Sequence, residues 1–149
     1  MPNNDFPAEQ GLYLESQLCF ALYSTSLAMT KTYKPLLDSI GLTYPQYLVM
    51  LVLWREAELT VSEIGERLFL DSGTLTPLLK RMETAGLLSR QRDTDDERRV
   101  RVKLSAAGKR LKSTAAKIPP CIQEVTGCSL LELMTLAKEI QMLRQRLMR

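Results

Sequence analysis

The chain has 149 residues, of which 45% are hydrophobic, and a formal net charge of +3, which suits one compact domain and excludes global disorder. It contains no histidine, so the usual general base, the Ser-His-Asp and Cys-His pairs, and most zinc sites are excluded. Its three cysteines form no CxxC pair, and no signal peptide or long apolar run is present. We therefore expect a cytoplasmic protein that is not an enzyme, with no membrane span, metal or cofactor.

Residues 1–10 have the composition of a loose tail, and apolar residues then recur at helical spacing from Leu14 to Ile40. Pro35 lies inside this run. We expect it to divide a long helix from a short one that ends at Gly41.

Capping signals predict three further helices, over 43–54, 60–68 and 71–85. Capping boxes begin at Thr43 and Thr60, and Asp71 or Ser72 caps the third helix, which stops at Gly86. A short helix, a tight turn and a second helix form the order of a helix-turn-helix.

Residues 87–92 and 99–104 alternate like the two strands of a hairpin, with 93–98 as the tip. A hairpin in this position completes a winged helix-turn-helix. The predicted fold class is therefore mainly α with a small β-hairpin wing.

The C-terminal part predicts two more helical regions. Ser105 caps a helix that Pro119-Pro120 ends or kinks, and a capping box at Ser129 starts a last helix that runs to Arg149. An apolar stripe follows the last helix with alternating spacings of three and four residues: Leu133, Leu136, Ile140, Leu143 and Leu147. The stripe needs a partner helix, either in the same chain or in a second copy. We favour a dimer formed by the N- and C-terminal helices, because the winged-helix core has apolar faces of its own.

The exposed side of helix 71–85 suits nucleic acid. Short hydroxyl groups near its start and cations one to two turns later are placed to contact bases and phosphates in a major groove: Ser72, Thr74, Thr76, Pro77, Lys80 and Arg81. In the wing, Asp96 can hold Arg98 extended toward a minor groove, and Arg90, Arg92 and Arg99 add phosphate contacts. The alternative is a solvated, charged hairpin with no ligand, but its position after a helix-turn-helix favours double-stranded DNA.

Two motifs carry a family resemblance, namely the string Asp-Ser-Gly-Thr-Leu-Thr-Pro-Leu-Leu-Lys-Arg-Met-Glu over 71–83 and the pattern Asp96-x-Arg98 followed by Val102-x-Leu104-Ser105-x-x-Gly108. They resemble the MarR family of bacterial transcriptional regulators. The resemblance spans essentially the whole chain and implies a cytoplasmic homodimer with interlocking terminal helices. It implies one domain over 1–149, with dimerisation helices at 11–41 and 105–149 and a DNA-binding lobe at 43–104. A dimer of this kind reads a pseudo-palindromic operator.

Cys19 is the candidate sensor. Its apolar neighbours suit a buried structural thiol, whereas the phenols of Tyr33 and Tyr44 and a helix N-terminus favour the thiolate that peroxides attack. The strings over 17–23, 33–37 and 42–48 resemble the OhrR branch, the repressors that sense organic hydroperoxides. In that branch the cysteine matching Cys19 is the peroxidatic sensor. The tyrosines matching Tyr33 and Tyr44 hydrogen-bond it from the other subunit.

Some members of this branch join the oxidised sensor to a small thiol, and others use a resolving cysteine of the partner subunit. Cys121 and Cys128 are the candidates here, on either side of the aligned position near Val125, and we lean slightly to Cys121. Both can equally be ordinary small residues at helix starts. Three other functions stay open: a regulator that binds a small phenolic ligand, a thiol peroxidase, and a winged-helix protein–protein module.

Overall fold

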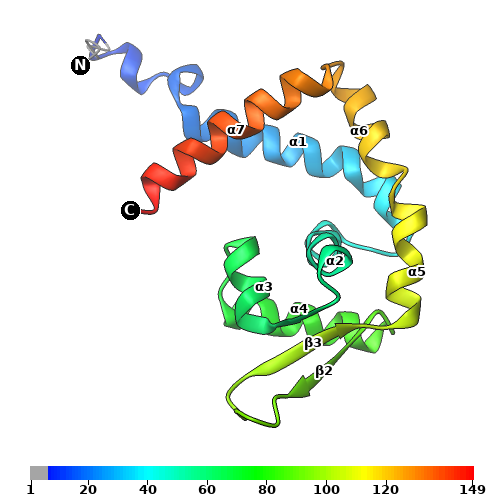
Figure 1. Ribbon diagram of the computed structural model, residues 1–149. Helices are drawn as coiled ribbons and strands as arrows, with labels where there is room; N and C mark the ends of the chain where they lie inside the picture. Colours follow the sequence, from blue (N-terminus) through cyan, green and yellow to red (C-terminus); the bar gives the residue numbers. More distant parts are fainter. Residues whose placement is uncertain (1–6) are drawn as a thin grey trace.

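The computed structural model describes residues 7–149 as a winged-helix lobe from which long helices extend (Figure 1). Two short 3-10 helices, Gln10–Leu12 and Leu14–Ser16, come first. The other elements, in chain order, are α1 (Leu18–Asp38), α2 (Tyr44–Arg55), β1 (Glu58–Thr60), α3 (Val61–Leu68), α4 (Ser72–Thr84), β2 (Leu88–Arg92), β3 (Val100–Leu104), α5 (Ala106–Ala115), α6 (Ile118–Thr126) and α7 (Leu130–Leu147). The predicted fold class, mainly α with a β-hairpin wing, is confirmed.

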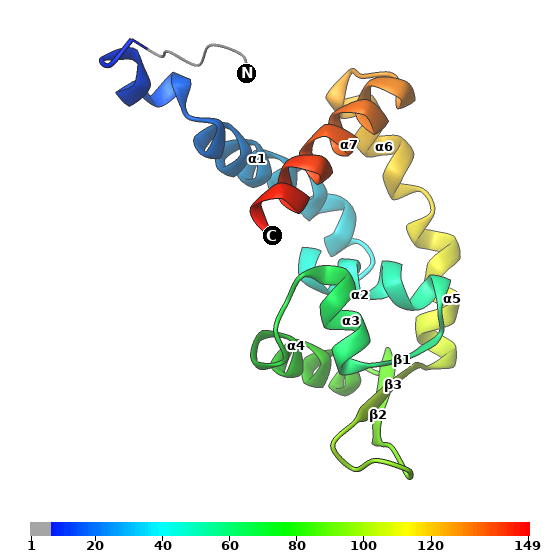
Figure 2. The same ribbon diagram turned by 60° about the vertical axis from the view of Figure 1, so that its left-hand side comes forward.

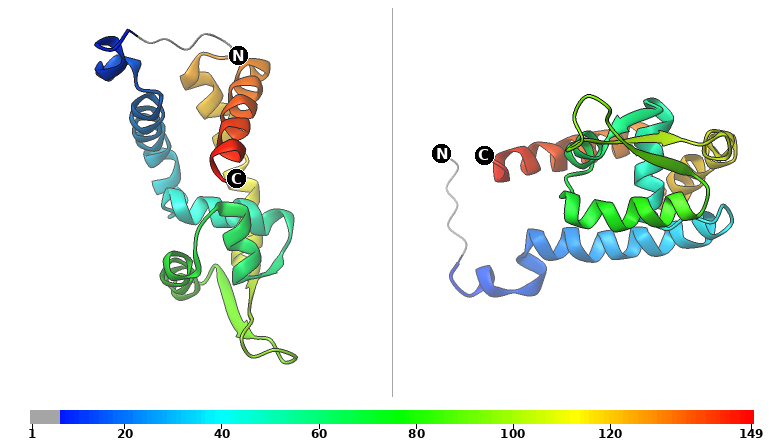
Figure 3. Two further views of the ribbon diagram at one scale, coloured as in Figure 1. Left: turned by 90° about the vertical axis from the view of Figure 1, so that its left-hand side faces the viewer. Right: turned by 90° about the horizontal axis from the view of Figure 1, so that it is seen from below.

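The lobe consists of α2, α3, α4 and the sheet, and the hairpin projects from its lower end (Figure 1). Helices α5 and α6 climb along one side of the molecule, and α1 and α7 extend above the lobe (Figure 2). In the left view of Figure 3, the N-terminal half of α1 diverges from α7 and from the lobe. Among residues 7–149, no helix combines the length and apolar character that crossing a membrane requires.

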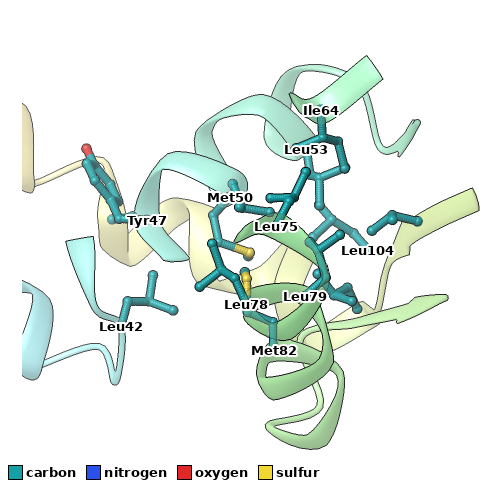
Figure 4. Packing of buried hydrophobic residues seen from close by; sticks show 14 of the residues in the cluster. Leu42, Tyr47, Met50, Leu53, Ile64, Leu75, Leu78, Leu79, Met82 and Leu104 are labelled. Atoms are coloured by element: carbon teal, nitrogen blue, oxygen red, sulfur yellow. The ribbon is translucent and has the colours of Figure 1, made fainter. Parts of the chain in front are cut away.

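The core lies where α4 packs against α2, α3 and the sheet (Figure 4). The apolar stripe of α4 follows helical spacing. Its residues are 5% exposed or less, namely Leu75, Leu78, Leu79 and Met82. These side chains meet Met50 and Leu53 of α2, Ile64 of α3 and Leu104 of β3 (Figure 4). Burying side chains of this size stabilises the fold by about 1.5–3 kcal/mol each, so the core fixes the opposite face of α4 toward solvent.

The predicted caps are confirmed. Reciprocal capping boxes start α2 at Thr43, α3 at Thr60 and α7 at Ser129. The Asp71 carboxylate accepts the Thr74 backbone N–H at 2.7 Å, and Gly86 has the positive φ that ends α4.

Two expectations for the N-terminal region are wrong. The first helix begins at Leu18 rather than Leu14, because the Gln17 side-chain amide donates to the carbonyls of Gly11 and Tyr13 and holds this segment in 3-10 turns. Pro35 does not divide α1. It lies in the last turn, where the missing N–H removes only one intrahelical hydrogen bond. The loose tail expected over 1–10 lies largely outside the described residues.

Two further features differ from expectation. Pro119 and Pro120 lie in the first turn of a separate helix, α6, where an absent N–H costs nothing. Strand β1 was not predicted, because three residues are too few to show a periodic pattern. It pairs with β3 in an antiparallel sheet of order β1-β3-β2, with Leu59 opposite Val102.

Gly108 provides a test of this packing. A Cβ atom there would lie 2.3 Å from the Leu87 carbonyl oxygen and 3.0 Å from the Leu104 side chain. Because backbone atoms cannot move aside, we expect Gly108→Ala to lower the free energy of unfolding by about 3 kcal/mol in urea denaturation. Gly73→Ala is the control, since its Cβ meets only the Asp71 side chain at 3.3 Å. Equal stability of the two variants would contradict this packing.

Candidate nucleic-acid interface and cysteine site

The solvent face of α4 carries all the residues predicted to contact DNA from this helix. Every one of them is exposed: Ser72, Thr74, Thr76, Pro77, Lys80 and Arg81. Pro77 lies inside the helix on this face, so the Gly73 carbonyl one turn earlier lacks its intrahelical donor. The face therefore presents hydroxyl groups and a free carbonyl at the helix start and cations further along, as a major-groove helix does.

The wing tip holds Arg98 far out in solvent. Its side chain is 91% exposed, and its Nε and Nη2 donate to the two Asp96 carboxylate oxygens at 3.1 and 3.3 Å. The same carboxylate accepts the Arg98 backbone N–H at 3.1 Å. These hydrogen bonds hold the pKa of the Asp96 carboxyl below its usual value, so Asp96 stays charged and keeps Arg98 extended.

Inside the hairpin, Asp93 fixes the tip to its base. It is 8% exposed and accepts the Asp95 backbone N–H at 3.0 Å and Arg101 Nε at 3.3 Å. The Asp93 N–H donates to the Arg99 carbonyl at 2.8 Å and closes the loop. The Arg98 guanidinium is thus carried by a loop that three hydrogen bonds of Asp93 tie to the hairpin.

The other predicted wing arginines differ in their surroundings. Arg99 is exposed, and Arg92 is exposed while its Nη1 donates to the Glu97 carbonyl at 2.9 Å. Arg90, in contrast, is paired with Glu83 of α4 at 3.3 Å, and only 23% of its side chain is exposed. Its geometry gives it a contact within the protein rather than the phosphate contact expected from the sequence.

Cys19 lies in the first turn of α1 and is exposed on the single chain. The buried structural thiol considered from the sequence is therefore absent within one chain. At a rise of 1.5 Å per residue, about 21 Å of helix separates Cys19 from Tyr33, so the two cannot meet within one straight helix.

Tyr33 and Tyr44 do meet each other. Their ring centroids lie 5.1 Å apart, and Tyr47 lies 5.8 Å from Tyr33. Burial, and then the neighbouring Tyr44 and Tyr47, raise the pKa of Tyr33 to about 12, and burial also raises the pKa of Tyr44. Both phenols therefore remain protonated at neutral pH and can donate hydrogen bonds.

The raised pKa of Tyr33 predicts a loss of stability at alkaline pH. The folded chain holds the phenol proton more tightly than the unfolded chain, whose pKa is near 10.0. This contribution is fully present below pH 10 and is lost as the pH rises through about 12. We expect Tyr33→Phe to remove the last phenolate transition from a titration followed at 295 nm. A wild-type titration that is complete by pH 10.5 or so would contradict the burial argument.

The other two cysteines lie near each other in sequence but in different settings. Cys121 is exposed on α6. Cys128 is half-buried before α7, with its sulfur 3.6 Å from the Thr126 carbonyl oxygen. Exposure therefore makes Cys121 the freer thiol of the two.

A large apolar surface on α1 and α7 has no partner within the described chain. On α7 the stripe predicted from the sequence is largely exposed, with Leu136 54%, Ile140 39% and Leu147 75% accessible. On α1, Leu18 and Tyr23 are 60% and 64% exposed. A cavity of about 730 Å³ lies beside α1 and the start of α2 and is lined by residues that include Leu27, Leu37, Leu42 and Tyr44. Apolar area of this extent is typical of a surface that binds another protein, a membrane or a ligand.

The C-terminal end of α7 also touches the helix-turn-helix. The Arg144 guanidinium lies 4.0 Å from the ring centroid of Phe69, which occupies the turn between α3 and α4. Phe69 is the one non-glycine residue with positive φ in the part of the chain that the structure describes. This contact connects a terminal helix to the element that aims α4.

Sequence reasoning missed three residues that shape these sites. Glu83 pairs with Arg90, Asp93 organises the wing, and Tyr47 completes the tyrosine cluster. An acidic residue in the last turn of a helix was the available signal for Glu83, because a carboxylate is disfavoured there. Asp93 and Tyr47 gave no such signal. Asp93 acts through the hairpin loop and Tyr47 through ring contacts, and both arrangements arise only in the folded chain.

Comparison with known proteins identifies the class of protein. Residues 31–115 match the family model described as transcriptional regulator SarA/Rot. The chain is 57% identical over 109 residues to the organic hydroperoxide resistance transcriptional regulator of Bacillus subtilis, covering 73% of this chain and 74% of that protein.

Solved structures extend the likeness to about nine-tenths of the chain. Reduced AbfR bound to DNA has 33% identity and a TM-score of 0.73, covering 91% of this chain and 96% of AbfR. Overoxidized AbfR bound to DNA has 33% identity and a TM-score of 0.76, covering 94% of this chain and 98% of AbfR. Disulfide-formed AbfR has 33% identity and a TM-score of 0.61, covering 94% of this chain and 93% of AbfR. A MarR mutant of E. coli, 23% identical with a TM-score of 0.77 over 89% of this chain and 97% of MarR, shares the fold. The chain therefore belongs to the MarR family of winged-helix transcriptional regulators and resembles its organic hydroperoxide resistance type.

Proposed function

We propose that this chain is a homodimeric repressor that binds a pseudo-palindromic operator in the reduced state and releases it when an organic hydroperoxide oxidises Cys19. The observation that carries the proposal is the separation of Cys19 from the Tyr33–Tyr44 cluster, about 21 Å along α1. A sensor site that combines them needs a second copy of the chain. The exposed apolar faces of α1 and α7 support such a copy.

DNA binding is assigned to α4 and the wing. The exposed residues of α4 enter a major groove, and Arg98 at the wing tip enters the adjacent minor groove. In a twofold dimer the two α4 helices meet half-sites about one DNA turn apart. AbfR, which is 33% identical to this chain, is known in a reduced form bound to DNA, and this supports DNA as the partner.

The chemistry begins at the Cys19 sulfur. The thiolate attacks the terminal oxygen of the hydroperoxide, the O–O bond breaks, and an alcohol leaves after the alkoxide takes up a proton. The sulfur becomes a sulfenic acid. A second thiolate, from Cys121 or Cys128 of the partner subunit or from a small thiol, then attacks this sulfur. The S–O bond breaks, the disulfide forms, and the departing hydroxide takes up a proton and leaves as water.

We assign DNA release to the disulfide rather than to oxidation itself. Overoxidized AbfR has been crystallised on DNA. The fold of this chain also matches disulfide-formed AbfR less well, with a TM-score of 0.61, than the two DNA-bound forms, with 0.73 and 0.76. A disulfide between subunits displaces the terminal helices. The Arg144–Phe69 contact then carries that displacement to the turn before α4. Misplacing one half-site forfeits several contacts of about 1–3 kcal/mol each, which is enough to release the operator.

Non-reducing electrophoresis tests the proposal and names the resolving residue. After one equivalent of cumene hydroperoxide, we expect a covalent dimer in the wild type that persists in Cys128→Ser and is absent in Cys121→Ser, because Cys121 is the more exposed thiol. A dimer lost only in Cys128→Ser would transfer the role to Cys128. If the wild type releases DNA without forming a covalent dimer, the proposed disulfide between Cys19 and a cysteine of the partner subunit is wrong.

A second candidate function rests on a smaller cleft of about 300 Å³ between α2 and α5. Tyr47 and Trp54 form its aromatic wall, and Arg55 and Lys112 supply cations, which together suit a small phenolic ligand. If a variant without Cys19 still releases DNA on hydroperoxide treatment, this candidate is favoured. Because the relatives are transcriptional regulators rather than enzymes, the thiol peroxidase alternative is not supported.

A further inference from the structure

Glu83 occupies a position that helix electrostatics disfavours. It lies in the last turn of α4, where the negative end of the helix dipole repels a carboxylate. Its two oxygens are both used by one residue of the wing. Oε2 accepts the Arg90 backbone N–H at 2.7 Å, and Oε1 accepts Arg90 Nη2 at 3.3 Å. One side chain of α4 thus binds β2 through both its backbone and its guanidinium.

The backbone N–H of Arg90 is available because β2 is an edge strand. In the order β1-β3-β2, Arg90 lies opposite Val102 on one side, and its N–H points to α4 on the other. Edge N–H groups are normally left to water. Here Glu83 satisfies the group and closes the open edge of the wing against the helix.

The Arg90 side chain is committed to this contact. It is 23% exposed, and its Nε is a buried polar atom without a hydrogen-bond partner in the described chain. A guanidinium turned into the protein in this way is poorly placed to reach a phosphate. Its position instead braces the base of the wing, six residues before the rigid tip that holds Asp96 and Arg98.

We propose that Glu83 and Arg90 are a positioning pair that sets the angle of the wing against α4, so that Arg98 and the start of α4 reach one duplex together. The inference rests on the proposed DNA-binding function and makes Arg90 a positioning residue instead of a phosphate contact. Leu88, Val102 and Leu104 anchor the sheet in the core independently, so loss of the pair changes the wing angle while the lobe stays folded.

The sign of the effect separates this role from simple electrostatics. Removing a carboxylate near DNA raises affinity if only charge matters. If Glu83 positions the wing, Glu83→Ala lowers affinity, and we expect a loss of about tenfold. Glu83→Gln keeps an acceptor for the Arg90 N–H and loses the ion pair, so we expect a loss of about threefold. Glu97→Ala, which removes the same charge from the exposed wing tip, is the matched control and should leave affinity equal or higher.

The experiment uses the full-length protein and a duplex that the wild type selects from a random-sequence pool. Fluorescence anisotropy gives the affinity of each variant, and amide hydrogen exchange reports the Arg90 N–H. We expect that N–H to be protected in the wild type and in Glu83→Gln and to exchange quickly in Glu83→Ala. In the Glu83→Ala background, Arg98→Ala should cost less than in the wild type, because the tip no longer reaches its groove.

The outcomes distinguish failure of the DNA-binding function from failure of the positioning role of Glu83 and Arg90. If the wild type selects no duplex, the DNA-binding function fails and the positioning role fails with it. If the wild type binds but Glu83→Ala binds as well as Glu97→Ala, only the positioning pair is overturned. Additive losses for Glu83→Ala and Arg98→Ala also overturn it, as does an Arg90 N–H whose exchange does not depend on Glu83.

Discussion

Replacement of Cys19 by serine is expected to abolish DNA release by organic hydroperoxide while leaving affinity in the reduced state within about twofold of the wild type. A hydroxyl has nearly the volume of a thiol but does not form a stable sulfenic acid. Cys19 is exposed on α1, far along the chain from α4 and the wing, so the substitution leaves the DNA-binding surface intact. Titration of an operator complex with cumene hydroperoxide, followed by anisotropy, measures the effect.

The controls for this prediction come from the same chain. Cys121→Ser and Cys128→Ser keep the sensor, so at least one of them should still release DNA. Tyr44→Phe removes a hydroxyl from the tyrosine cluster without touching the sulfur. We expect it to retain release with a slower oxidation of Cys19. Full hydroperoxide response in Cys19→Ser would exclude the redox mechanism and favour a ligand cleft such as the one between α2 and α5.

The second large effect is expected at the wing tip. Arg98→Ala should weaken operator binding about 10- to 100-fold, because a minor-groove arginine contributes on the order of 1–3 kcal/mol. The slope of log affinity against log salt should fall by about one, since one cationic contact is lost. Anisotropy at several salt concentrations measures both quantities.

Arg98→Lys is the matched variant. It keeps the charge and loses the forked pair with Asp96, whose oxygens accept Arg98 Nε and Nη2. We therefore expect an unchanged salt slope with a weaker affinity than the wild type. If Arg98→Ala and Arg98→Lys both bind as the wild type does, the wing tip does not enter a groove.

Much of the fold was predictable because its signals are local. Capping boxes at Thr43, Thr60 and Ser129 depend on residues three apart, and each of them starts a helix at the predicted position. The buried stripe of α4 follows from helical periodicity, which also places the opposite face in solvent. The Asp96–Arg98 pair joins near neighbours in sequence, and the structure contains it.

The failures share a physical cause. Pro35 was expected to break α1, but a proline in a last turn removes only one hydrogen bond, and packing of Leu37 in the core keeps the helix intact. Strand β1 exists only because β3 lies beside it. Arg90 was assigned to phosphate because charge is visible in a sequence while its partner, Glu83, becomes a neighbour only when β2 folds back on α4.

The sequence by itself determined the winged-helix order and the exposed face of α4, since these follow from periodicity and caps. It pointed to Cys19, Tyr33 and Tyr44 as candidate sensor residues through the resemblance to the OhrR branch. Only the tertiary structure decided that Tyr33 of α1 and Tyr44 of α2 form one cluster, because the two rings meet only when α2 packs against α1. It also decided that the apolar sides of α1 and α7 stay uncovered in one chain. Those facts depend on contacts between residues far apart in sequence, which no local pattern encodes.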